Sequence, residues 1–143
     1  MAKFATRKPY DGTDHQALIR GINWLMAGNP AQAFIYTPAK RNAQDMASDT
    51  TMPDPLKELF KQILKSNSVK IDSTNIGLCF GSGAGSCGTV PEHGSTARIL
   101  LCYANPNSVG WLLTRAPNAD VCLLPWTAKE AEDWRKCHSP TIV

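Results

Sequence analysis

Short runs of consecutive apolar residues alternate along the chain with segments in which apolar residues recur every three or four positions. The runs lie at Ala33–Tyr36, Val69–Ile71, Ile76–Phe80, Ala97–Tyr103 and Val121–Leu124. A run of this length that is apolar at nearly every position is typical of a strand buried on both faces. We therefore predict five strands at these positions, of which Val69–Ile71 is the shortest.

Helical periodicity and capping residues occupy the intervals between the runs. Residues 11–14 provide caps for a first helix that ends at Gly28. Thr37 and Pro38 are the residue types favoured at the N-cap and first position of a second helix. Asp54 and Pro55 repeat this pattern before a third helix. Its apolar stripe is the clearest in the chain and consists of Leu56, Leu59, Phe60, Ile63 and Leu64.

Two more helices are predicted in the last third of the chain. One begins at Asn105–Pro106 and carries apolar residues on one side. The other begins at Thr127, which forms a capping box with Glu130, and Trp126 occupies the hydrophobic-staple position before it. Strands and helices in this order predict one three-layer α/β domain with a mostly parallel sheet and helices on both faces, Rossmann-like or flavodoxin-like in a loose sense. We expect this domain to span residues 1–143, with residues 1–10 as a flexible arm.

A glycine-rich segment at residues 81–96 separates two of the predicted strands. Glycine lets backbone N–H groups approach a ligand closely, so the segment could bind an anion, close over a site, or be an irregular loop without a ligand. Gly83, Gly85 and Gly88 match the spacing G-x-G-x-x-G. No helix opens within the match, which argues against a dinucleotide fingerprint, and no Gly-Lys-Ser/Thr follows, which excludes a Walker A loop.

Ligands of open parallel sheets bind beyond the carboxyl ends of the strands, where helix N-termini also attract anions. This rule predicts a binding site for a nucleotide-like or other anionic small molecule, although several of these residues would serve equally as helix caps. Besides the three glycines, the residues gathered there are Tyr36, Thr37, Lys40, Arg41, Tyr103, Asn105, Asn107, Trp126, Thr127 and Lys129.

Catalysis is a weaker hypothesis, because no established catalytic motif is present. Cys87, Glu92 and His93 are candidates for nucleophile, acid and base in a hydrolase or transferase. These side chains share one glycine-rich segment, whereas catalytic pairs are usually distant in sequence, so an incidental polar loop is the alternative. We expect no metal, because the cysteines and histidines lack metal-ligand spacing, and we expect no cofactor.

Composition narrows the function classes further. The net charge is +3, and a row of lysines at positions 57, 61 and 65 is typical of a solvated helix face, so we do not expect nucleic acid as a partner. No apolar run approaches the about 20 residues that span a bilayer, and the five cysteines form no disulfide pattern. We therefore expect a cytoplasmic protein.

The alternative function is a protein-interaction module, an inhibitor or adaptor, that uses the glycine-rich segment and an exposed Trp such as Trp111.

Overall fold

The computed structural model describes residues 3–5, 15–27, 30, 32–81, 88–92, 94, 96–105 and 109–143. Within this part of the chain, one seven-stranded sheet forms the centre of the molecule, with the strand order β3-β4-β2-β5-β6-β1-β7. The strands are β1 (Lys3–Ala5), β2 (Gln32–Thr37), β3 (Ser68–Ile71), β4 (Thr74–Phe80), β5 (Arg98–Cys102), β6 (Asp120–Leu124) and β7 (Thr141–Ile142).

Parallel pairing links every neighbouring pair of strands except β3 and β4, which form an antiparallel hairpin. The predicted mostly parallel sheet is therefore confirmed. Strand β2 lies at its centre and pairs along its whole length with β4, from Gln32↔Asn75 to Thr37↔Phe80. The continuous apolar runs follow from this arrangement, because residues 33–37 of β2 are all buried.

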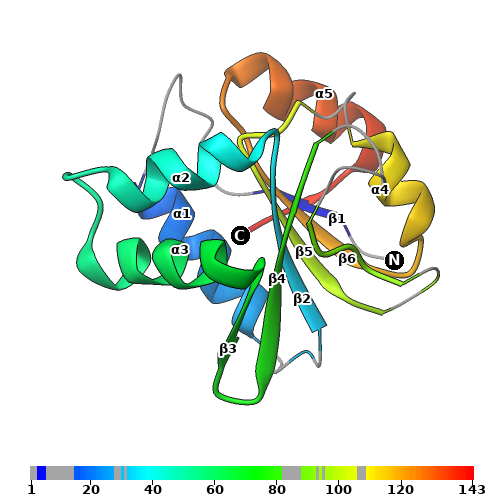
Figure 1. Cartoon of the computed structure of the whole chain (residues 1–143). Coiled ribbons are helices and arrows are strands. Elements are labelled where there is room, and N and C mark those ends of the chain that lie inside the picture. The colour runs from blue at the N-terminus through cyan, green and yellow to red at the C-terminus, as the bar shows by residue number, and fades with distance from the viewer. Residues whose placement is uncertain are drawn as a thin grey trace.

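Helices cover both faces of the sheet (Figure 1). Helices α1 (His15–Met26), α2 (Lys40–Ser48) and α3 (Asp54–Ser66) pack on one face, and α4 (Gly110–Arg115) and α5 (Ala128–His138) pack on the other. Successive residues of the central strand β2 enter opposite cores: Ile35 packs with α1–α3, whereas Phe34 packs with α4 and α5. The three-layer α/β fold predicted from the sequence is thus present.

The start of α2 differs from the prediction, and the N-cap assigned to Thr37 is wrong. Pairing with Phe80 keeps Thr37 within β2, and its hydroxyl donates to the carbonyl oxygen of Ala39 at 2.9 Å. The N-cap residue is Ala39, whose N–H donates to the Asn42 side-chain oxygen at 2.8 Å. The turn after β2 is therefore two residues longer than the sequence pattern indicated.

The capping box of α5 is confirmed. Thr127 Oγ1 accepts a hydrogen bond from Glu130 N at 3.2 Å, and Glu130 Oε1 accepts one from Thr127 N at 3.1 Å. Helix α4 begins at Gly110 rather than at Asn105, which lies in irregular structure, and residues 106–108 are outside the described part.

Two further features of the described chain position the sheet. Residues Lys3–Ala5, which lie in the segment expected to be a flexible arm, form β1 between β6 and β7. Three residues are too few to produce a recognisable sequence pattern.

Gly77 of β4 lies where a Cβ would be 2.9 Å from the Phe34 ring and 3.0 Å from Thr89 Cγ2. A side chain at this position would overpack against Phe34 and Thr89, so the close packing favours glycine.

Candidate functional site

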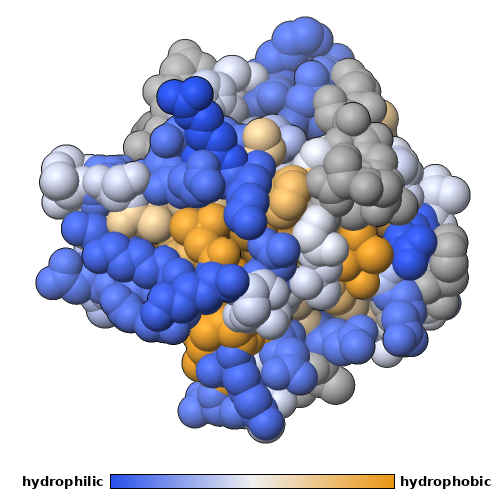
Figure 2. All heavy atoms as spheres, viewed as in Figure 1, coloured by the Kyte–Doolittle hydropathy of each residue, from blue (hydrophilic) through white to orange (hydrophobic). Residues whose placement is uncertain are grey.

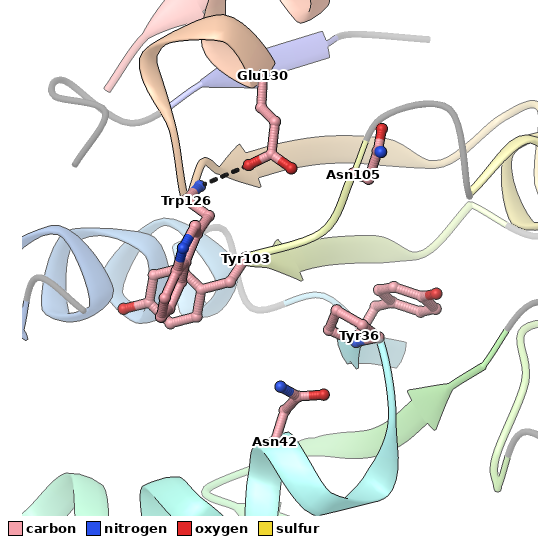
Figure 3. Close-up of a pocket in the computed structure, with 7 residues that line it drawn as sticks. Tyr36, Asn42, Tyr103, Asn105, Trp126 and Glu130 are labelled. Atoms are coloured by element: carbon pink, nitrogen blue, oxygen red, sulfur yellow. Dashed lines mark hydrogen bonds between the residues drawn. The ribbon is translucent and has the colours of Figure 1, made fainter. Parts of the chain in front are cut away.

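A pocket of about 330 Å³ lies at the carboxyl ends of β2, β5 and β6. Figure 3 shows its side chains arranged around a common space, with Glu130 and Asn105 on one side and Asn42 on the opposite side. Three aromatic rings, two amides and one carboxylate surround this space. The lining residues are Tyr36, Pro38, Asn42, Tyr103, Asn105, Trp126 and Glu130.

The topology of the sheet explains why a pocket forms here. Strands β2 and β5 are neighbours, but the helices that follow them pack on opposite faces: α2 and α3 follow β2, whereas α4 follows β5. The chain therefore leaves the two strand ends in opposite directions and opens a crevice between them, as in other open parallel sheets. Tyr36 near the end of β2 and Tyr103 just beyond β5 form its walls.

Tyr36 connects the pocket to the end of β4. Its side chain is 2% exposed, and its hydroxyl donates to the carbonyl oxygen of Gly81 at 2.5 Å. Gly81 N also donates to the carbonyl oxygen of Pro38 at 3.2 Å. The first residue of the glycine-rich segment is thus held against the pocket wall at two points.

Tyr103 adopts a backbone conformation that is unfavourable for a residue with a side chain. Its φ is +54°, in the left-handed region, and its N–H donates to the carbonyl oxygen of Leu124 at 2.8 Å. The Tyr103 ring meets the Trp126 ring edge-on, with centroids 5.2 Å apart and planes at 85°. Such outliers cost about 1–3 kcal/mol and concentrate at functional sites, so this conformation marks the strand end as a candidate site.

Trp126 is held by its backbone and exposes its ring. Glu130 Oε1 accepts hydrogen bonds from both Trp126 N and Thr127 N, each at 3.1 Å (Figure 3). The Trp126 side chain is 41% exposed, although most tryptophans pack in the core. The capping box of α5 therefore also fixes the position of an aromatic wall of the pocket.

A second hollow of about 190 Å³ adjoins the first, and Asn42, Tyr103 and Trp126 line both. Asp45, Met46 and Asp49 complete its lining. Asp49 accepts hydrogen bonds from the Thr51 hydroxyl at 2.7 Å and from Thr51 N at 2.9 Å, and its other oxygen lies 3.3 Å from His15 Nε2. These contacts, first among them the Thr51 hydroxyl, lower the pKa of Asp49.

The residues predicted from the sequence are only partly gathered here. Tyr36, Tyr103, Asn105 and Trp126 line the pocket, and Thr127 caps the helix beside it. Gly88 lies apart and pairs with Cys79, and Glu92 is exposed and lines none of these hollows. Gly83, Gly85, Cys87, His93 and Asn107 are outside the described residues.

The predicted cations do not line the pocket. Lys40 is half-buried and Arg41 is exposed in the first turn of α2, where Asn42 is the residue that lines the cavity. Lys129 is exposed and lies 3.4 Å from Asp133 on its own helix. Sequence reasoning missed Asn42 and Glu130 as pocket residues. Glu130 had a signal in the capping box, which places the third helical residue back toward the strand end, whereas Asn42 had none, because the N-cap of its helix is Ala39.

Three of the cysteines are buried in the sheet and do not offer a nucleophile. Cys79, Cys102 and Cys122 are free thiols in the two cores, whereas Cys137 is exposed. Burial raises the pKa of Cys102 and raises that of Cys122 to about 12, so both thiols are neutral near pH 7. Trp111 is half-buried against the core beneath α4 and α5, so Trp126 rather than Trp111 is the exposed tryptophan.

Another hollow, of about 380 Å³, lies between α1, α3 and β3 and is lined almost entirely by apolar residues. Figure 2 shows apolar surface between α2 and α3 and beside β3. The hollow lacks a charged lining residue, so it offers less chemistry than the strand-end pocket. Its lining residues are Ile19, Ile22, Asn23, Pro53, Pro55, Leu56, Leu59 and Ile71.

Comparison with known proteins adds no functional information. No family model, no curated protein and no solved structure matches the chain. Within the described residues, no helix has the length and apolar character needed to cross a bilayer. In the same residues, no three His, Cys, Asp or Glu side chains gather in a way that would hold a metal ion.

Proposed function

We propose that this protein binds a small molecule with a planar ring, of the nucleoside or nucleotide class, in the pocket at the ends of β2, β5 and β6. The observation that carries the proposal is the coincidence of a cavity of about 330 Å³ with the point where the helices change faces of the sheet. Ligand pockets are typically about 300–1,000 Å³ and mostly apolar with a few polar groups. This cavity fits that description.

The lining chemistry supports a ring with hydrogen-bonding groups at its edge. Tyr36, Tyr103 and Trp126 provide aromatic surface against which a flat ring can pack. Asn42 and Asn105 provide amide donors and acceptors. The side-chain oxygen of Asn42 already accepts a hydrogen bond from Ala39 N, so its NH₂ group is the part that can donate to a ligand.

A phosphate on such a ligand would lie outside the pocket lining. Lys40 and Arg41 precede Asn42 in the first turn of α2. Asn42 lines the pocket, so these two cations are the candidates for binding a phosphate beside it. Lys40→Ala and Arg41→Ala are therefore expected to weaken nucleotide binding but not nucleoside binding. Equal affinity of wild type and both variants for nucleotides would remove the cations from the site.

Thermal unfolding against a panel of nucleosides and nucleotides tests the proposal. A ligand at 100 times its dissociation constant adds about 2.7 kcal/mol when it binds only the folded state. This corresponds to a midpoint rise of roughly 5–10 °C for a domain of this size. Trp126→Ala should abolish the rise, whereas Ile142→Ala, which removes another exposed apolar side chain, should not. A panel without any rise, or a rise that persists in Trp126→Ala, would refute the proposal.

A protein-interaction module is the second candidate, and the exposure of Trp126 favours it. Exposed tryptophans are common at the centres of binding interfaces. In this case a protein partner would bind wild type and Ile142→Ala equally and lose affinity for Trp126→Ala, while no small molecule would shift the unfolding midpoint. Partner binding that is unchanged in Trp126→Ala would exclude this use of the ring.

A further inference from the structure

The described charged side chains that line the concavity around Trp126, formed by the two adjoining hollows, are all negative. The two adjoining hollows share Asn42, Tyr103 and Trp126, so they form one continuous surface around the edge-on ring pair. Among the described residues that line them, the charged side chains are all carboxylates: Glu130 in the first hollow, Asp45 and Asp49 in the second. No Lys, Arg or His belongs to this described lining.

The nearby cations leave this imbalance in place. His15 lies 3.3 Å from Asp49 but does not belong to the described lining of the second hollow, and Lys129 lies 3.4 Å from Asp133 on α5. Lys40 and Arg41 belong to α2 but are not lining residues. Of the described charged side chains, a ligand in the concavity would therefore meet carboxylates and none of these cations.

The aromatic rings independently favour the same sign of charge. The face of a Trp or Tyr ring attracts cations that lie within about 6 Å of its centroid. The ring planes of Tyr103 and Trp126 are at 85°, so one ring of the pair turns its face, and the other its edge, toward a given side. Trp126 is 41% exposed, so part of its ring surface is accessible to a ligand. Ring faces together with carboxylates are a combination that recognises organic cations.

We propose that the ligand ring bound in this pocket carries a positive charge, as in a nucleoside whose base is methylated on a ring nitrogen. This inference rests on the proposed function and specifies the class of nucleoside. It differs from the expectation of an anionic ligand, because the positive charge would lie against Trp126, Glu130 and Asp45. Any phosphate would have to point away from them.

Two methylated adenosines of nearly the same size and opposite charge state test the inference. The base of 1-methyladenosine is protonated and cationic at neutral pH, whereas N6-methyladenosine, an isomer of its deprotonated form, is neutral. We expect 1-methyladenosine to bind at least about tenfold more tightly in titration calorimetry, since one carboxylate at about 4 Å contributes about fivefold even in bulk water. This preference should shrink as salt rises from about 0.1 M to about 1 M, where the screening length falls from about 10 Å to about 3 Å.

Variants identify the carboxylates responsible. Asp45→Asn combined with Glu130→Gln removes two charges and retains an oxygen that can accept the capping hydrogen bonds, and it should reduce the preference at least about fivefold. Glu132→Gln is the matched control, because Glu132 is exposed on α5 and pairs with Lys136 rather than lining the pocket. Equal or tighter binding of the neutral isomer overturns the positive charge while leaving nucleoside binding intact. If neither these isomers nor any unmodified nucleoside binds, the proposed function fails with it.

Discussion

Glu130 has two separable roles, and its substitution provides the sharpest test of the site. Its Oε1 atom accepts hydrogen bonds from Trp126 N and Thr127 N, and its charge lies in the first turn of α5. Glu130→Ala removes the acceptor and the charge, whereas Glu130→Gln removes only the charge. The difference between the two variants therefore measures the two hydrogen bonds alone.

The expected free energies follow from the exposure of the groups. Each hydrogen bond contributes a net of about 0.5–1.5 kcal/mol, and these two lie at the lower end because water reaches the Trp126 backbone when Glu130 is removed. The charge near the helix N-terminus contributes about 0.3–1 kcal/mol. We expect Glu130→Ala to lower the free energy of unfolding by about 1.5–2 kcal/mol and Glu130→Gln by about 0.5 kcal/mol.

Urea unfolding followed by circular dichroism measures both values, and an unchanged slope identifies a change in stability alone. Glu132→Ala on the same helix is the control and should change stability by less than about 0.5 kcal/mol, because its ion pair with Lys136 is exposed. Equal destabilisation by Glu130→Ala and Glu130→Gln would show that the hydrogen bonds contribute nothing. The claim that the cap positions Trp126 would then be refuted as well.

Two further predictions concern the sheet. Gly77→Ala should destabilise the protein by about 0.5–2 kcal/mol, because the cost of overpacking against Phe34 exceeds the gain from restricting the unfolded backbone. Gly110→Ala is the control, because a Cβ at Gly110 meets nothing within 4 Å. Equal stability of the two variants would contradict the close packing at Gly77. Burial raises the pKa of Cys122 from 9.0 to about 12, so the unfolded chain loses this proton first and stability should decline as the pH rises above 9.0. Urea unfolding across this range should show a shallower decline in Cys122→Ala, and an identical decline would exclude this thiol as a cause.

Most of the fold could be predicted because its signals are local. The apolar runs reflect strands that are covered on both faces, and the capping box at Thr127 reflects hydrogen bonds within four residues. The assignment of Thr37 as an N-cap failed because its conformation depends on pairing with Phe80 in another strand. A single sequence contains no signal for that pairing.

The candidate site was predictable in position and less so in chemistry. The strand-end rule gathers Tyr36, Tyr103 and Trp126 correctly, because the carboxyl ends of parallel strands meet at one edge. The rule also gathers Lys40, which does not line the pocket. Lys40 and Asn42 are two residues apart on a helix, so their side chains project from different sides of it. The left-handed backbone of Tyr103 depends on its hydrogen bond to Leu124, a contact across the sheet that the sequence pattern does not contain.

The position of β1 has a consequence for how the chain folds. Phe4 pairs with Cys122 on one side and with Thr141 on the other, so β1 lies between two strands that are distant from it in the sequence. Contacts between distant parts of a chain form slowly, because the loop between them must close first. Pairing among β2, β4 and β5 closes shorter loops than the docking of β1 does. We therefore expect the insertion of β1 between β6 and β7, at the edge farthest from the β3–β4 hairpin, to be a late step of folding.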